Sequence, residues 1–403
     1  MQPGARFTVV PFLAMLILSA GAIAQDWPLR RFNANDGLNG TYRTADNGKT
    51  WKEMTLPAGA ESIFFLNPTT GWALINFDNG TSNPGFALGS THDAGATWSV
   101  TPIKVQVNPN QIILPGQGHL FFVDEKHGWV NLLVQSGSAF DFGLLLRTVD
   151  GGKHWTPTKG PGTYEDVRFI NPNDGWQLGP HQTELWATHD GGKTWEQVVL
   201  KPPPEMRAAD EVTYGLPVFG DGKHGAVEAT FHSMPSASEQ LTHKLLFITS
   251  DGGHHWTFNE VAVNQKDFDG WLLYTANGSV VIVPSVSDGK LVLKKISVDE
   301  TSTTTTTASS AGFFSSVSAI SFSSPNDGWV SAGACCEAAC PTCAWKPSSR
   351  VSCAADEDDD RPMGRQCGVL LSTDDGGQSW TDITLRQTCV RVDNGPEHCT
   401  VQK

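Results

Sequence analysis

Short apolar runs separated by polar turns recur along most of the chain. Five of them share one pattern, in which an apolar run leads into a polar turn and then into Gly, usually followed by Trp: "FFLNPTTGWAL" (64–74), "FFVDEKHGWV" (121–130), "FINPNDGWQL" (169–178), "VFGDGKHGAV" (218–227) and "FSSPNDGWV" (322–330). This apolar–turn–apolar pattern is typical of a β-hairpin. No long apolar pattern with a period of 3.6 residues is present, so the sequence predicts an all-β chain of many short strands.

A second motif, T-x-D-x-G-x-x-W, occurs six times. Its copies are "TADNGKTW" (44–51), "THDAGATW" (91–98), "TVDGGKHW" (148–155), "THDGGKTW" (188–195), "TSDGGHHW" (249–256) and "TDDGGQSW" (373–380). The copies begin 47, 57, 40, 61 and 124 residues apart, and the last interval has room for one further repeat without the motif. A repeat of this length made of short strands predicts a β-propeller.

Each repeat is expected to form one four-stranded blade, which gives a single propeller of seven blades. The repeat without the motif is placed at 269–310, where the threonine run 301–307 fits a linker and a fourth strand equally well. Little chain precedes the first motif. The C-terminal tail "TCVRVDNGPEHCTVQ" (388–402) is therefore expected to supply two strands of the first blade and to close the ring, with Cys389 opposite Cys399.

The T-x-D-x-G-x-x-W motif has a structural explanation as a turn between the third and fourth strands. Its Gly provides the positive φ that the turn needs, its Asp accepts hydrogen bonds from loose backbone N–H groups, and its Trp opens the next strand and is expected to bury against the next blade. Six copies on six blades cannot converge on one site, so the structural interpretation is preferred to metal binding by the acids or by His254 and His255. The residues concerned are Asp46, Asp93, Asp150, Asp190, Asp251, Asp375, Trp51, Trp98, Trp155, Trp195, Trp256 and Trp380.

Charge and the N-terminal segment favour an exported protein. The net charge is −14 and no basic run is present, which argues against nucleic acid or anionic lipid as a partner. The start "MQPGARFTVVPFLAMLILSAGAIAQ" is typical of a signal peptide, predicted as 1–24 with cleavage before Gln25. A retained anchor or a buried first strand is the alternative. The mature domain 25–403 is expected in the periplasm or outside the cell, without a membrane span.

All eight cysteines lie at or beyond position 335. Six of them fall in a loop insertion of the last blade, 331–368, which also holds the acidic run "ADEDDDR" (355–361). In an exported protein an even, clustered count predicts disulfides. Zinc ligation by "CEAACPTC" and calcium binding by the acidic run remain alternatives, but we expect neither a metal nor a cofactor. The cysteines are Cys335, Cys336, Cys340, Cys343, Cys353, Cys367, Cys389 and Cys399.

With its six motif copies, the chain resembles the BNR or Asp-box repeat proteins, and the motif is called the Asp box below. The added "NPNDGW" hairpins are most similar to the propeller family of photosystem II assembly and stability factors, which has many non-photosynthetic relatives. The resemblance covers nearly all of the mature chain and implies Asp boxes on the face remote from the ligand site. The repeats also occur in sialidases, other glycosidases and sortilin-type receptors, so they imply no single activity. The photosynthetic role is not expected, because this chain is acidic and lacks a basic recognition patch.

Strand parity places function in the loops opposite the Asp boxes. There we expect a protein or glycan to bind near His181, Glu184, His232, His243 and Tyr214. The favoured function is a monomeric, non-catalytic binding or assembly module. The main alternative is a glycoside hydrolase that uses Glu165 and Glu184; a sialidase is disfavoured because the chain has only four Tyr and lacks an Arg-Ile-Pro element. An adhesion or receptor ectodomain is a third alternative.

Overall fold

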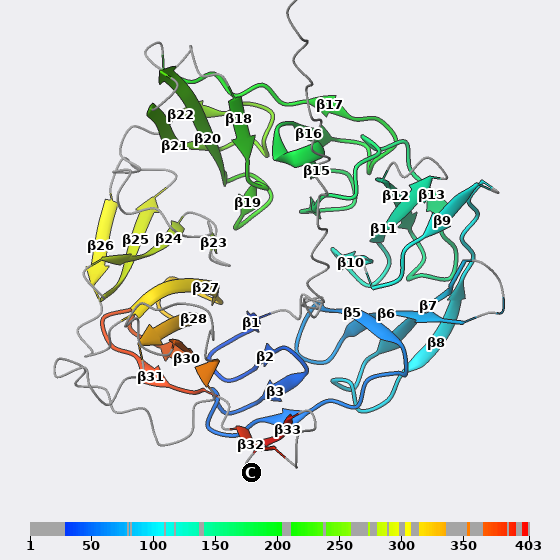
Figure 1. Ribbon diagram of the computed structural model, residues 1–403, viewed down its shortest axis with the longest axis horizontal. Coiled ribbons are helices and arrows are strands. Elements are labelled where there is room, and N and C mark those ends of the chain that lie inside the picture. The colour runs from blue at the N-terminus through cyan, green and yellow to red at the C-terminus, as the bar shows by residue number, and fades with distance from the viewer. Residues whose placement is uncertain are drawn as a thin grey trace, which may run out of the picture.

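Seven four-stranded β-sheets stand in a ring around a central channel in the computed structural model (Figure 1). The predicted all-β, seven-bladed propeller is therefore confirmed. Among the described residues the single helical segment is the 3₁₀ turn η1 (Pro180–Gln182). No helix in this part of the chain has the length and apolar character needed to cross a membrane. The structure describes residues 29–401 except 79, 81–82, 109, 117, 137–140, 204–210, 237–238, 259–272, 275–279, 288–289, 298–302, 308–313, 336–352, 355–365, 385–386 and 392–396.

Within each blade the strands pair antiparallel, and the first main strand lies next to the channel (Figure 1). Blades 1 to 4 comprise β1 (Leu29–Arg31), β2 (Gly37–Asn39), β3 (Tyr42–Thr44) and β4 (Lys52–Glu53); β5 (Ala60–Phe65), β6 (Gly71–Phe77), β7 (Gly85–Thr91) and β8 (Ser99–Ile103); β9 (Gln111–Ile113), β10 (His119–Phe122), β11 (Gly128–Ser136), β12 (Asp141–Thr148) and β13 (Thr156–Pro157); β14 (Val167–Phe169), β15 (Gly175–Leu178), β16 (Leu185–Thr188) and β17 (Glu196–Gln197).

The remaining strands form blades 5 to 7 and a separate hairpin. They are β18 (Glu211–Tyr214), β19 (Val218–Phe219), β20 (Gly225–Ser236), β21 (Glu239–Thr249) and β22 (Thr257–Phe258); β23 (Leu273–Tyr274), β24 (Val280–Ser287), β25 (Lys290–Ser297) and β26 (Thr303–Thr307); β27 (Phe314–Phe322), β28 (Gly328–Cys335), β29 (Cys353–Ala354), β30 (Gln366–Thr373) and β31 (Thr381–Asp382); and the hairpin β32 (Gln387–Arg391) with β33 (Glu397–Val401). The threonine run thus forms a fourth strand, β26, in the blade without an Asp box.

The hydrophobic core is divided into layers between the blades. Each of the seven boundaries between neighbouring blades holds one cluster of buried apolar side chains among the described residues. The cluster between blades 4 and 5, for example, joins Trp176 and Leu185 to Val227 and Phe247. Because both faces of a blade are buried, apolar and polar residues alternate little along its strands, and the strand sequences are nearly continuous apolar runs.

The fully buried tryptophans between neighbouring blades come from the Gly-Trp hairpins rather than from the Asp boxes. Trp129 of blade 3 is fully buried and stacks on Phe169 of blade 4, with ring centroids 3.7 Å apart. The Asp-box residue Trp195 is only partly buried and meets Phe169 edge-on within blade 4, at 6.0 Å. Trp195 packs on the cluster between blades 3 and 4, so it lies at the boundary with the preceding blade and not with the next blade that the sequence predicts.

The first blade takes its inner strands from residues 29–39, not from the C-terminal tail. Register pairs Leu29 with Asn39 in β1 and β2, and β1 lies against β27 and β28 of blade 7. The tail instead forms the separate hairpin β32–β33, in which Cys389 is opposite Cys399. The predicted closure by the tail is thus corrected. The two arginines of "LRRF" explain why the sequence pattern does not predict this inner strand, since most other blades have an apolar run at the same place.

Candidate functional site

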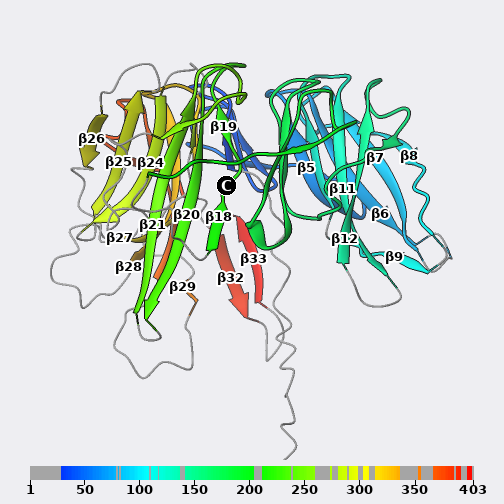
Figure 2. The same cartoon turned by 90° about the horizontal axis from the view of Figure 1, so that it is seen from above.

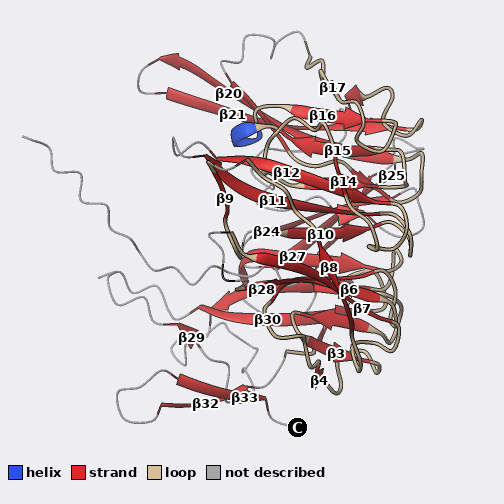
Figure 3. Cartoon of the chain, turned by 90° about the vertical axis from the view of Figure 1, so that its right-hand side faces the viewer, coloured by secondary structure: helices blue, strands red, loops and turns tan. Residues whose placement is uncertain are grey.

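The two ends of the ring differ in what they offer a ligand. The Asp boxes and the turns after the innermost strands lie at one end, called the box face. The opposite end, called the loop face, carries η1 and the far ends of β20 and β21 (Figure 3). Three short strands extend blades at the loop face: β9 pairs with the end of β11, β18 with the end of β20, and β29 with the start of β30 (Figure 2).

At the box face every Asp-box carboxylate is engaged by its own turn. In the fourth box, Asp190 Oδ1 accepts hydrogen bonds from the Thr188 hydroxyl at 3.0 Å and from the Thr194 N–H at 2.9 Å, and Oδ2 accepts from the Thr194 hydroxyl at 2.7 Å. The following Gly192 has a φ of 89°, and its N–H donates to Thr188 Oγ1 at 2.9 Å. The other five boxes make the same contacts with small changes.

These contacts stabilise the charged form of the carboxylates. Hydrogen bonds from the Thr97 side chain and backbone lower the pKa of Asp93 to about 2. The Ser379 side chain and backbone do the same for Asp375, whose pKa is also about 2. A carboxylate so strongly stabilised as an anion is a poor general acid, since a general acid must hold its proton near neutral pH.

The histidines of the fifth box do not converge on a common point. His255 Nδ1 lies 2.6 Å from Asp251 Oδ2, within its own turn. His254 instead stacks on His189 of blade 4, with ring centroids 4.2 Å apart. Within the part of the chain that the structure describes, no group of three or more His, Cys, Asp or Glu side chains has a geometry that would hold a metal.

On the loop face, His181 and Glu184 share one turn but face different neighbours. The turn is closed by Gly179, whose N–H donates to the Glu184 carbonyl at 2.8 Å, and His181 is exposed with a φ of 55°. Glu184 Oε2 accepts a hydrogen bond from the Trp186 indole at 2.9 Å. A Cβ at Gly179 would lie 2.6 Å from Glu184 Cβ, so this turn is tightly packed.

Glu165 lies in another loop, which is fixed to blades 3 and 4. The Thr163 carbonyl accepts a hydrogen bond from Gln177 Nε2 at 2.8 Å, and the Glu165 carbonyl accepts one from Asn131 Nδ2 at 3.1 Å. The hydrogen bonds of Glu165 and Glu184 thus go to different partners in different loops. Tyr164, between the two anchored carbonyls, keeps 42% of its surface exposed.

The structure does not bring His232 and His243 together on one side of their hairpin. Register pairs His232 with Thr242 and Phe231 with His243. Consecutive pairs point to opposite faces of a sheet, so the two imidazoles lie on opposite faces. Tyr214 at the end of β18 is half-buried in the layer between blades 4 and 5, and burial raises its pKa.

Two buried carboxylates escaped the sequence analysis. Glu228 of β20 accepts a hydrogen bond from the Thr230 hydroxyl at 3.2 Å and lies 4.0 Å from Lys244 Nζ; burial raises its pKa. Glu61 of β5 accepts a hydrogen bond from the Gly116 N–H at 2.7 Å, and burial also raises its pKa. The sequence signal that could have identified both residues is an acidic residue inside an otherwise apolar strand.

The structure does not describe the cysteine side chains, so the predicted disulfides are not tested. The signal peptide 1–24 and most of the insertion 331–368 also lie outside the described residues. The backbone register alone places Cys353 opposite Cys367, just as it places Cys389 opposite Cys399.

Exposed apolar side chains accompany these loops. Phe77 is the last residue of β6 and is 44% exposed, and Ile112 on β9 is 48% exposed. Both values are similar to that of Tyr164. The backbone around Ile112 is fixed by Asn83, which accepts a hydrogen bond from the Ile113 N–H at 2.8 Å and donates to the Gln111 carbonyl at 3.3 Å. The loop face therefore presents apolar groups on a rigid frame.

Comparison with known proteins confirms the expected resemblance at a distance. The chain is similar to the photosystem II assembly lipoprotein Ycf48 of Synechococcus sp. (strain CC9902), with 24% identity over 184 residues that make up 42% of this chain and 47% of the relative. The matched stretch thus spans about half of the relative's length. No protein-family model matches the chain.

Two solved structures align with most of the chain at low sequence identity. YCF48 from Cyanidioschyzon merolae aligns over 85% of this chain and 91% of its own, with 15% identity and a TM-score of 0.45. An ulvan lyase of polysaccharide lyase family PL25 aligns over 82% of this chain and 84% of its own, with 11% identity and a TM-score of 0.41.

Proposed function

We propose that this chain is an exported, non-catalytic binding module that holds a protein partner on its loop face. The observation that carries the proposal is the set Phe77, Ile112 and Tyr164, whose side chains are 42–48% exposed on strand ends and anchored loops. Exposed aromatic and aliphatic groups on a rigid frame favour protein binding, because they gain buried area at little cost in ordering.

The similarity to an assembly lipoprotein supports a role in assembly. The contact of Glu184 favours a structural role over a catalytic one for this side chain, because its carboxylate accepts a hydrogen bond from the indole of Trp186. The acidic net charge of −14 favours a partner with a basic surface.

Site-specific photo-crosslinking tests the proposal. A benzophenone side chain replaces Tyr164 or Ile112 on the loop face, and matched variants carry it at Val149 on the box face and at Val199 beyond β17, which are 54% and 72% exposed. The variants are expressed in the native host with the export signal intact. We expect one protein adduct from the two loop-face positions, lost on competition with unlabelled protein, and none from the two controls. Equal adducts at all four positions would refute binding through the loop face.

A further inference from the structure

Two arginine side chains in the central channel have no place in the proposed binding surface. On the innermost strand of six of the seven blades, one residue pairs with the residue that follows the first glycine of the next strand. These pairs are Arg30 with Leu38, Phe64 with Trp72, Phe121 with Trp129, Arg168 with Trp176, Val218 with Ala226 and Ser321 with Trp329. The shared register puts these residues at one level of the channel, and blades 1 and 4 contribute arginine where the others contribute apolar or small side chains.

Both arginines line one cavity of about 550 Å³. Its walls are polar and apolar in about equal parts; the apolar part includes Phe121, Val218 and Ile320, and the cavity reaches the turn 220–222 at the box face. Blades 1 and 4, which carry the two arginines, are not neighbours in the ring (Figure 1). A cavity of this size, lined by apolar side chains and a few charged groups, is typical of a small-molecule site.

The guanidinium groups are held in place, yet neither is neutralised by an ion pair among the described residues. Arg30 Nη1 donates to the Phe65 carbonyl at 2.7 Å, and its guanidinium lies 5.2 Å from the centre of the Phe64 ring. Arg168 Nη1 donates to the Pro217 carbonyl at 3.2 Å. Burial lowers the pKa of Arg30 to about 10 and also lowers that of Arg168, although Asp166 opposes the second shift. A guanidinium keeps its proton in proteins at neutral pH, so both groups carry a positive charge.

The acid in the cavity wall is already engaged. Asp221 accepts hydrogen bonds from the N–H groups of Lys223 and His224, at 2.8 and 2.6 Å, and its Oδ2 lies 2.8 Å from His224 Nδ1. The channel therefore keeps a positive charge inside a chain whose net charge is −14. Charges that are partly withdrawn from water without a counter-ion are costly, and an anion bound between them would offset that cost.

We propose that the central channel binds a small organic anion with at least two carboxylate groups. Its carboxylates pair with Arg30 and Arg168, and its carbon skeleton packs against Phe121 and Ile320. The planar guanidinium fork matches a carboxylate with two parallel hydrogen bonds, and such charge-assisted bonds are about twice as strong as neutral ones. The site opens at the box face, so it is independent of the loop face and of the proposed partner there.

Isothermal titration calorimetry of the mature chain tests this site. The probes are linear dicarboxylates from malonate to adipate, and inorganic phosphate is the oxyanion without a carbon skeleton. We expect at least one dicarboxylate to bind more tightly than phosphate. Arg30→Gln and Arg168→Gln should each weaken that binding about tenfold or more, the loss of one charge-assisted pair. Arg43→Gln is the matched control, because Arg43 is also partly buried but lies outside the channel.

Thermal unfolding keeps the test decisive if a glutamine variant folds poorly. The ligand should raise the Tm of the wild type and of Arg43→Gln, and Arg168→Lys, which keeps the charge but loses the fork, should show a smaller rise. The proposal fails if no dicarboxylate binds at about 10 mM, or if the channel variants bind as the wild type does. Equal binding of phosphate would reduce the site to a simple oxyanion site and reject the organic ligand.

Discussion

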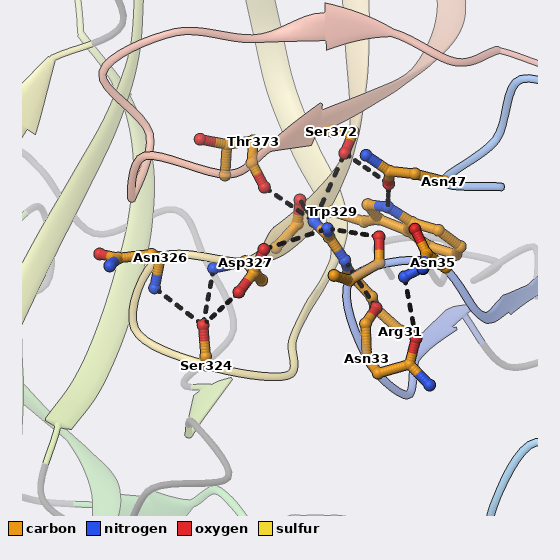
Figure 4. Close-up of polar contacts among 12 residues, drawn as sticks. Arg31, Asn33, Asn35, Asn47, Ser324, Asn326, Asp327, Trp329, Ser372 and Thr373 are labelled. Atoms are coloured by element: carbon orange, nitrogen blue, oxygen red, sulfur yellow. Dashed lines mark hydrogen bonds and ion pairs between the residues drawn. The ribbon is translucent and has the colours of Figure 1, made fainter.

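Arg31 of the first blade donates a hydrogen bond from Nη1 to the main-chain carbonyl oxygen of Thr373 in the seventh blade, at 2.7 Å (Figure 4). The same nitrogen donates to the Gly328 carbonyl at 3.0 Å, and Nη2 lies 3.3 Å from Asp327 Oδ1. Only 1% of the side chain is exposed. Register pairs Arg31 with Gly37, the place where blades 2 to 5 and 7 have phenylalanine. The ring thus closes through a buried arginine instead of an aromatic ring.

Loss of this arginine should weaken closure of the ring. Arg31→Ala removes the donor from Asp327 and from four main-chain carbonyl groups, so we expect the free energy of unfolding to fall by about 3–5 kcal/mol. Arg31→Phe should cost less, because the ring can pack on Trp329 as its counterparts do elsewhere. Urea denaturation at pH 7 measures both. An Arg31→Ala protein as stable as the wild type would show that closure does not depend on this contact.

The glycine of the Gly-Trp hairpins is required for packing rather than for φ. A Cβ at Gly175 would lie 2.4 Å from Phe169 Cδ1, and Phe169 is itself stacked against Trp129. Gly175→Ala should therefore destabilise the fold by about 1–3 kcal/mol. Gly222→Ala is the matched control, since a Cβ there meets no atom within 4 Å. Thermal unfolding compares the two, and an equal loss in both would contradict the steric explanation.

The Asp boxes predict how the protein responds to acid. The pKa of Asp93, Asp150, Asp190, Asp251 and Asp375 is about 2 in the folded chain, below the ordinary value near 4. A lowered pKa gives stability that is present above pH 4 and is lost as the pH falls towards 2. We expect denaturation midpoints that change little between pH 7 and 5 and drop below pH 4.

A variant of one Asp box tests whether the box carboxylates cause this loss of stability. Asp190→Asn cannot lose a negative charge on acidification, although its amide oxygen can still accept hydrogen bonds in the turn. Its midpoint should lie below that of the wild type at pH 7, and its fall between pH 4 and 2 should be shallower. If the acid dependence of this variant were as steep as that of the wild type, the box carboxylate would not be its source.

Glu228 predicts the opposite dependence on pH. Burial raises its pKa, so the folded chain binds a proton more tightly there than the unfolded chain does. The charged form therefore costs stability once the pH exceeds the folded pKa. Glu228→Gln should be more stable than the wild type at pH 7, with a difference that shrinks towards pH 4. The exposed Glu211→Gln is the control and should change little. A destabilised Glu228→Gln at pH 7 would mean that its contacts outweigh its burial.

The sequence predicts the fold well where the signal is local. The Gly-Trp hairpins and the Asp boxes each fix a turn through a few neighbouring residues, so their spacing is enough to count the blades. The inner strand of blade 1 was missed because Arg30 and Arg31 replace the apolar pair found at 64–65. Their burial depends on partners such as Asp327, about 300 positions away in the chain, which no local pattern contains.

The candidate site was harder to predict, because it depends on where side chains point. His181 and Glu184 share one turn, but only the structure shows that Trp186 engages the carboxylate. His232 and His243 are close in sequence and register, yet the pleat of the sheet separates their side chains.

Incubation of the purified mature protein with a broad glycan panel, read by mass spectrometry, tests most directly the claim that the module is non-catalytic. The account predicts that every glycan keeps its mass after prolonged incubation, with Glu165→Gln and Glu184→Gln indistinguishable from the wild type. Shortened glycans in the presence of the wild type, and intact glycans with either variant, would contradict the account and identify a glycoside hydrolase.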